Sequence, residues 1–422
     1  STPEVLNKNK SKLIHLKKLI RSELADFWLK SKPNFSARAL ELFSKPAELK
    51  KDEKNKLSEE ALKAKQEELK TKKEEQKRYA LNHHPVNALS LLDHPQLNSE
   101  LIKIKAALDR ARIDNEKIRQ NASFHLDFRQ ATEDKEYFVE GNSSADKVSP
   151  AGNFSLKYEG DELIQGVYSS GFFSHLLSDK HAALFSSQNF KSENKGLWVK
   201  SMGQLSSMKA MVRNYPLDHS PLHKTSILAN SQWAWNDGNI RTSYWEGEQI
   251  HLELRTSGQA IIGRENNHQR SWFGVSELIV AARRPNIIGA SLGDLCDPSK
   301  IKNKKDLIQA YRKVLGKALK AWKSQTCSDQ EAQFIDAMIK TSVLSNKVSS
   351  MSKRLQKFIR IYRKLELQIE TPRRAPGLIK GHVQDQRLMI RGNYKKPGEI
   401  IPRGFMEVFS KDIYKGPGGG RL

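Results

Sequence analysis

The chain of 422 residues contains only two cysteines, and no stretch in it approaches the ~18 consecutive apolar residues that would span a bilayer. Because the two cysteines lie far apart, the sequence has no CxxC pair, no CxxCH haem-attachment site and no Cys/His spacing typical of zinc. GxSxG, HExxH and phosphate-binding-loop motifs are absent as well. These absences argue against a membrane span and a covalent haem on this chain. They also remove the usual signals of a serine hydrolase, a zinc protease or a nucleotide enzyme.

The two cysteines, Cys296 and Cys327, bracket a predicted helix. Their placement fits a single disulfide in an oxidising compartment, and it fits two separate thiols equally well. The chain opens at Ser1 without an initiator methionine, which indicates a processed product or a piece of a longer protein.

The formal charge of +24 favours a nucleic-acid or polyanion binder at first sight, but its distribution does not. Residues 1–120 carry 27 basic and 18 acidic groups, residues 300–371 carry 17 and 6, and residues 372–422 carry 11 and 4. Residues 121–299 carry only 17 basic against 20 acidic groups. The central part therefore has the charge of an ordinary folded surface, and nucleic acid is not the expected partner.

Residues 1–120 are predicted to form a charged helical arm. Apolar residues recur at helical spacing from Leu13 to Trp28, which predicts an amphipathic helix. The run from Pro46 to Arg78 interleaves Lys and Glu at three- and four-residue spacing, which indicates a solvated helix rather than a phosphate-binding face. We expect His83 and His84 to be ordinary surface histidines of a turn, because no further metal ligands accompany them.

Residues 121–299 are predicted to form an antiparallel β-sandwich of the jelly-roll or lectin-like kind. Apolar residues alternate strictly in 154–158 and in 250–254, which places one face of each strand in a core and the other in water. Segments 197–199 and 260–262 are further strand candidates.

The helical period returns in residues 300–371, which predict a basic bundle of three helices. Residues 372–422 are rich in turn residues and then in glycine, so we expect a turn-rich tail and a linker. The predicted fold class is thus multidomain α and β: a central sandwich between N-terminal charged helices and a C-terminal basic helical bundle.

Three groups of segments resemble the large exported surface proteins of planctomycetes and verrucomicrobia, which combine two domains of unknown function, often with a planctomycete-type cytochrome c. The most specific segments are 371–377 (TPRRAPG), 385–386 (DQ), 391–399 (RGNYKKPGE) and 402–403 (PR). The central region is similar through 152–154 (GNF), 178–180 (SDK), 184–187 (LFSS) and 245–247 (WEG). The turn at 84–89 (HPVNAL) is similar to a segment that precedes this region.

The resemblance implies that the chain is an internal region of such a protein, exported to the periplasm or the cell surface. Its partners would be flanking domains of its own precursor or other subunits of a complex. The resemblance implies no cofactor on this chain, although haem would be expected on the missing domains or on a partner. It implies no catalytic residues.

The candidate ligand-binding residues are aromatic side chains with polar neighbours in the sandwich, because sugars stack on exposed aromatic faces. Trp233 and Trp235 have strand spacing and should face the same way, which is also typical of a β core. Tyr244 and Trp245 lie beside Gly247, in a turn where exposure is more natural. The full candidate set is Tyr244, Trp245, Trp233, Trp235, Arg213 and Asp237.

The function predicted from these patterns is an exported, non-catalytic interaction or scaffold region with a carbohydrate-binding sandwich, part of a larger assembly. Two alternatives stay open: an accessory part of a cytochrome-linked redox or polysaccharide-degrading enzyme, and a polyanion or nucleic-acid binder. Glu246, Glu248 and Glu253 could supply the paired carboxylates of a glycosidase, but a turn favours solvated acids. We therefore expect no catalytic site on this chain, and no metal site.

Overall fold

The structure is a computed structural model, and it describes residues 3–44, 59–81, 83–131, 136–141, 148–213, 226–238, 244–257, 270–288, 295, 297, 299–370, 386–393 and 395–401. Two compact units are present. Unit 1 comprises Ser1–Asn115, Pro150–Ser170 and Asn286–Gln368, and unit 2 comprises Glu116–Ser149, Gly171–Pro285 and Ile369–Leu422. In sequence order the chain has helices, an antiparallel sandwich and helices again, which confirms the predicted fold class.

Unit 1 is mainly helical. Its helices are α1 (Pro3–Lys30), α2 (Phe35–Phe43), α4 (Glu59–Tyr79), α6 (Lys304–Ser324), α7 (Asp329–Lys340) and α8 (Lys353–Leu367), with the 3-10 turns η1 (Asn87–Leu91) and η3 (Val348–Ser350). It also holds one hairpin of strands, β3 (Asn153–Leu156) and β4 (Ile164–Tyr168). Helix α5 (Leu97–Gln120) contributes residues to both units.

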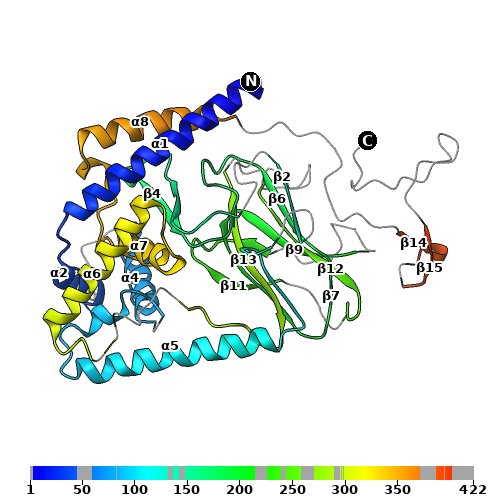
Figure 1. Cartoon of the computed structure of the whole chain (residues 1–422), viewed down its shortest axis with the longest axis horizontal. Helices are drawn as coiled ribbons and strands as arrows, with labels where there is room; N and C mark the ends of the chain where they lie inside the picture. The colour runs from blue at the N-terminus through cyan, green and yellow to red at the C-terminus, as the bar shows by residue number, and fades with distance from the viewer. Residues whose placement is uncertain are drawn as a thin grey trace. The chain divides into compact units, whose positions relative to one another are not determined.

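The predicted N-terminal helix and the three C-terminal helices are confirmed, and α1 lies beside α6 and α8 (Figure 1). The apolar stripe of α1, from Leu13 to Trp28, is buried. Helices α6 and α7 each begin with a capping box, in which Asn303 and Ser328 cap the free amides of the first turn. No helix among the described residues is long and apolar enough to cross a membrane.

The β3–β4 hairpin belongs to the helical unit, whereas the sequence placed these residues in the sandwich module. The Phe154 ring lies 5.3 Å from the ring of Trp322, whose indole Nε1 donates a hydrogen bond to the carbonyl of Gly152 at 2.7 Å. Gly152 has φ +80°, and a Cβ there would approach the Cβ of Cys327 to 2.7 Å, so only glycine fits. The alternation of apolar residues predicts a strand, but it does not indicate which hydrophobic core the strand packs against. The hairpin was therefore assigned to the wrong unit.

His84 is buried, so the prediction of two ordinary surface histidines was wrong for this residue. Its ring lies 5.0 Å from the ring of Tyr79, and its Nδ1 accepts a hydrogen bond from the amide of Val86 at 3.4 Å. Burial, together with the neighbouring positive side chains, lowers the pKa of His84 to about 3. The imidazole is therefore neutral and forms part of the core.

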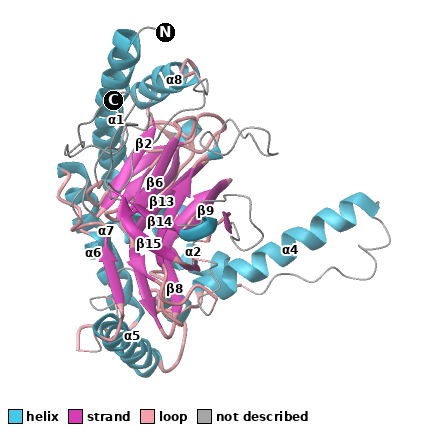
Figure 2. Cartoon of the chain, turned by 90° about the vertical axis from the view of Figure 1, so that its right-hand side faces the viewer, coloured by secondary structure: helices cyan, strands magenta, loops and turns pink. Residues whose placement is uncertain are grey.

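Helix α4 is mostly exposed, which confirms the predicted solvated helix over the part of 46–78 that is described. Near its C-terminal end, the Gln76 side-chain amide donates hydrogen bonds to the carbonyls of Leu42 and Ser44 at 3.0 and 2.6 Å. Beyond this attachment α4 extends away from the other helices of unit 1 (Figure 2).

Unit 2 contains two antiparallel sheets and a hairpin (Figure 2). The first sheet has the order β1 (Phe124–Asp127), β13 (Trp272–Ala281), β8 (Gly196–Gln204) and β11 (Ala234–Asp237), with β5 (Phe172–Phe173) also paired to β13. The second has the order β10 (Ser226–Leu228), β9 (Ser206–Val212), β12 (Gln249–Arg255), β6 (Ala183–Ser187) and β2 (Tyr137–Gly141), with β7 (Phe190–Lys191) paired to β12. The hairpin consists of β14 (Gln386–Met389), η4 (Ile390–Gly392) and β15 (Pro397–Ile401).

The two sheets pack through aromatic side chains. The ring of Phe172, in the first sheet, lies 5.3 Å from Phe185 in the second and 5.8 Å from Phe273 in its own sheet. A hydrogen bond of 2.7 Å from the Ser206 hydroxyl to the carbonyl of Trp272 also joins the sheets. The described strands therefore enclose one core, as a sandwich requires.

The predicted strands at 197–199 and 250–254 are confirmed as parts of β8 and β12, while 260–262 lies outside the described residues. Ile250, Leu252 and Leu254 point into the core, as the alternation predicts. The opposite face of β12 is less exposed than predicted, because Glu253 on that face is buried.

Candidate functional site

The candidate site of the sandwich is the turn at residues 244–248, which leads into β12. Its backbone is held by three hydrogen bonds: the Glu248 amide to the Trp245 carbonyl at 3.0 Å, the Gly247 amide to the Ser192 carbonyl at 2.8 Å, and the Ser192 amide to the Glu248 carbonyl at 2.8 Å. Gly247 has φ +87°, the left-handed region that favours glycine. The turn is therefore fixed to the residue that follows β7. We call these five residues the Tyr244 turn.

The two aromatic residues of the Tyr244 turn have opposite environments. The side chain of Trp245 is fully buried, whereas Tyr244 keeps 48% of its surface exposed. Their ring centres lie 4.8 Å apart at an interplanar angle of 84°, an edge-to-face contact. Trp245 thus anchors the turn in the core and Tyr244 is presented at the surface, so only Tyr244 of this pair can meet a ligand.

Basic side chains lie close to the Tyr244 turn. The Lys395 ammonium, from the loop between β14 and β15, lies 5.0 Å from the centre of the Tyr244 ring, a cation–π distance. Arg213 follows β9, and its amide donates to the carbonyl of Gln249, the first residue of β12, at 2.8 Å. The pKa of Arg213 is lowered, first by burial and secondly by the charge of the Arg387 guanidinium. Arg387, on β14, is therefore a further cation near Arg213.

The other predicted aromatic residues do not join this site, and this corrects the predicted grouping. Trp235 on β11, in the first sheet, is buried in a cluster with Ile118, Ile279 and Ala281. Trp233 is partly buried, with its ring centre 5.5 Å from that of Phe173. Asp237 is exposed on β11, which belongs to the first sheet, whereas the Tyr244 turn leads into β12 of the second. Trp235 is therefore core, as the strand spacing allowed.

The three glutamates considered for glycoside hydrolysis have separate roles. Glu246 is exposed in the turn and Glu248 is partly buried there. Glu253 lies 3.2 Å from the Nε2 atom of His251 and forms an ion pair with Arg255. Burial alone would raise the pKa of Glu253, but these partners leave it lowered, so this carboxylate stays ionised and is not a general acid.

Cys327 is the cysteine that lies in the described part of the chain. The Cys327 thiol is free and buried, and burial raises its pKa to about 12, so it remains protonated. Cys296 lies outside the described residues, and because the Cys327 thiol is free, this structure does not contain the disulfide considered for the pair. Among the described residues, no group of three or more His, Cys, Asp or Glu side chains could hold a metal ion.

Sequence reasoning did not include Lys395 in the candidate set. The sequence of segment 391–402 allows two interpretations: its basic residues contact a partner, or its turn residues hold the tail against its own fold, which is the interpretation that we favoured. The turn residues of this segment, with Gly392 at φ +71°, shape the hairpin that brings Lys395 to the Tyr244 ring. A basic residue in a tail does not indicate, from the sequence alone, which aromatic ring it will contact in the fold.

No known family model matches the chain, and no curated protein matches it. Among solved structures, the chain is similar to the carbohydrate-binding module TmCBM61 in complex with β-1,4-galactotriose. The identity is 12%, the TM-score is 0.22, and the match covers 36% of this chain and 91% of that module.

Proposed function

We propose that unit 2 is a carbohydrate-binding module and that Tyr244 is its contact with sugar. The observation that supports this proposal is an exposed aromatic ring on a turn that hydrogen bonds and a buried tryptophan already hold in place. A sugar ring stacks its C–H face on such an aromatic face. Since the turn is fixed beforehand, binding loses little conformational entropy there.

The charges around the ring indicate the class of sugar. Lys395 contacts Tyr244, and Arg213 lies at the same end of the sheet as the Tyr244 turn. Cations beside a stacking platform favour a sugar that carries a carboxylate or a sulfate, because charge-assisted hydrogen bonds are stronger than neutral ones. We therefore propose acidic polysaccharide as the ligand.

The proposal is tested by screening the full chain on an array of neutral and acidic glycans, followed by calorimetric titration of the best ligand. We expect Tyr244→Ala to weaken binding at least tenfold. We expect Lys395→Gln to weaken binding of acidic glycans only, and salt to have the same effect. Ile227→Ala is the matched control, because Ile227 is 59% exposed on β10 of the same sheet but outside the Tyr244 turn. Unchanged binding in Tyr244→Ala, or no bound glycan on the array, would contradict the proposal.

We further propose that this module works as an exported, non-catalytic scaffold within a larger protein of the kind the sequence resembles. The β14–β15 hairpin supports such a role, because it exposes four large aliphatic side chains: Leu388, Ile390, Ile400 and Ile401. A two-stranded hairpin of this kind is marginally stable in water unless another surface covers it. Flanking domains or another subunit, including one that carries haem, are the proposed partners.

The intact mass of the protein isolated from its native source tests the scaffold proposal. We expect a mass well above the 48.1 kDa of this chain, or co-purification of a second subunit. The absorption spectrum of the same sample shows whether haem is part of the assembly. A free chain of 48.1 kDa without partners would contradict the scaffold role and leave the sugar-binding proposal untouched.

A further inference from the structure

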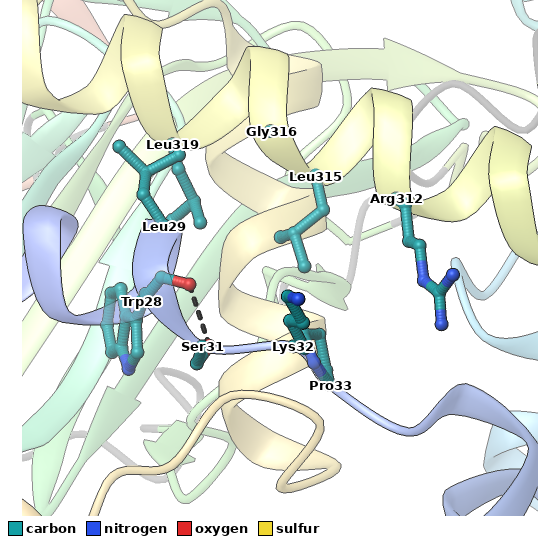
Figure 3. A pocket seen from close by; sticks show the side chains of 9 residues that line it. All are labelled: Trp28, Leu29, Ser31, Lys32, Pro33, Arg312, Leu315, Gly316 and Leu319. Carbon is teal, nitrogen blue, oxygen red and sulfur yellow. Dashed lines mark hydrogen bonds between the residues drawn. The ribbon is translucent and has the colours of Figure 1, made fainter.

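A pocket of about 380 Å³ lies in unit 1, far along the sequence from the Tyr244 turn (Figure 3). It is formed where α1 ends and the chain continues through Ser31, Lys32 and Pro33, opposite the middle of α6. Its volume is within the range of small-molecule sites, about 300–1,000 Å³. Nothing in the sugar-binding proposal uses this pocket.

Gly316 is the feature of α6 that keeps the pocket open. It lies inside a helix, without a positive φ, where glycine is less favourable than alanine. Neighbouring atoms do not require it either, because a Cβ at this position would have nothing within 4 Å. Gly316 therefore lines the pocket with its backbone alone, although a residue with a side chain at this position would make α6 more stable.

The walls of the pocket are apolar and partly rigid. The side chains of Leu315 and Leu319 extend from α6 toward the end of α1 (Figure 3). On the other side, Trp28 is fixed by a hydrogen bond of 2.8 Å from its indole Nε1 to the carbonyl of Ser345. Because Trp28, Leu315 and Leu319 are at most 4% exposed, they form a fixed floor. The apolar body of a ligand would exclude water from the partly buried lining residues Leu29, Pro33 and Gly316.

Among the described residues, three polar side chains line the pocket: Ser31, whose hydroxyl donates a hydrogen bond to the carbonyl of Trp28 at 2.7 Å, and two cations. Lys32 and Arg312 are exposed members of its lining, and neither forms an ion pair with any described residue. None of the described residues that line the pocket is acidic. A guanidinium binds a carboxylate through two parallel hydrogen bonds, and a nearby ammonium adds a third charge-assisted donor. The charge and the surface of the pocket together select a ligand that is apolar at one end and anionic at the other.

We propose that this pocket binds a small monocarboxylate with an apolar body, with Arg312 and Lys32 on the carboxylate and the body over Gly316. This site is independent of the Tyr244 turn, so either proposal can fail without the other. The ligand is a free small molecule, because the pocket is of small-molecule size and lies on one helix–turn junction rather than along a groove.

The test is titration of the full chain with sodium octanoate, followed by calorimetry and by saturation-transfer NMR, with octan-1-ol as the uncharged probe. We expect saturable binding of octanoate at one site. Gly316→Leu should weaken binding of both probes at least tenfold because the leucine fills the pocket. Lys32→Gln combined with Arg312→Gln should weaken octanoate about tenfold and leave octan-1-ol unchanged.

Two controls separate loss of the site from loss of the fold. Gly316→Leu should melt at the same or a higher temperature, because leucine is a better helix former than glycine. Lys313→Gln removes one exposed cation of α6 that does not line the pocket, and it should bind octanoate as the parent chain does. The proposal is overturned if the parent chain does not bind octanoate at millimolar concentration, or if Gly316→Leu binds it unchanged.

Discussion

Trp245→Ala is expected to lower the free energy of unfolding of unit 2 by about 3–5 kcal/mol. The Trp245 side chain is fully buried and contacts the Tyr244 ring edge to face, so its removal leaves a cavity that the fixed turn cannot fill. Equilibrium unfolding in urea, followed by circular dichroism, measures the change through the shift of the midpoint at constant slope.

The neighbouring substitution is the control for this prediction. Tyr244→Ala removes a ring that is half exposed, so we expect it to change the stability of the fold by less than about 1 kcal/mol while it removes sugar binding. The two adjacent substitutions should therefore separate stability from binding. A Trp245→Ala variant as stable as the parent would show that the turn is not anchored through this side chain, and the argument for a pre-organised Tyr244 would fail.

The difference between Tyr244 and Trp245 also shows how far the sequence could lead. The turn beside Gly247 correctly predicted an exposed aromatic residue at 244–245. Two adjacent aromatic residues in a turn have no periodic pattern, however, so the sequence does not indicate which of the two side chains points inward. Sequence reasoning treated Trp245 as a sugar contact, and its complete burial corrects this. The direction of a side chain in a turn depends on backbone hydrogen bonds to distant residues such as Ser192, which no local pattern reveals.

Periodic elements were predicted well because their signal is local. The stripe of α1 and the alternation in β12 follow directly from helical and strand spacing. The assignment of the 153–168 hairpin to a unit depends on a long-range contact, because Phe154 packs on Trp322, 168 positions later in the sequence. The pocket in unit 1 had one signal that could have been noticed, a glycine inside a predicted helix at Gly316.

A second large effect is expected for Arg119→Ala, which should destabilise unit 2 by about 3–5 kcal/mol. Glu277 on β13 is only 1% exposed, and it accepts hydrogen bonds from the Arg119 guanidinium at 2.7 and 3.2 Å. His125 lies 2.9 Å from the same carboxylate. Without the arginine, the buried Glu277 carboxylate keeps the contact with the His125 ring and the charge of Lys200, but it loses both guanidinium hydrogen bonds. A buried charge that loses its main partner is far more costly than an exposed one.

The pH dependence of the same pair gives a check on the cause. Burial alone would raise the pKa of Glu277, but the hydrogen bonds from His125 and Arg119 lower it to about 2, below its ordinary value of 4.5. The pair therefore stabilises the folded state fully above pH 4.5, and this stability, roughly 3 kcal/mol, is lost as the pH falls through 2.

In Arg119→Ala the burial effect should dominate and raise the pKa of Glu277 above its ordinary value. The stability of the variant should then fall as the pH rises above 4.5, opposite in sign to the parent chain. Denaturant unfolding from pH 3 to pH 8 measures both curves. Arg119→Met combined with Glu277→Leu should recover most of the lost stability and remove this pH dependence, because no buried charge is left. If Arg119→Ala follows the same pH curve as the parent, the arginine does not set the ionisation of Glu277, and the destabilisation comes from lost packing alone.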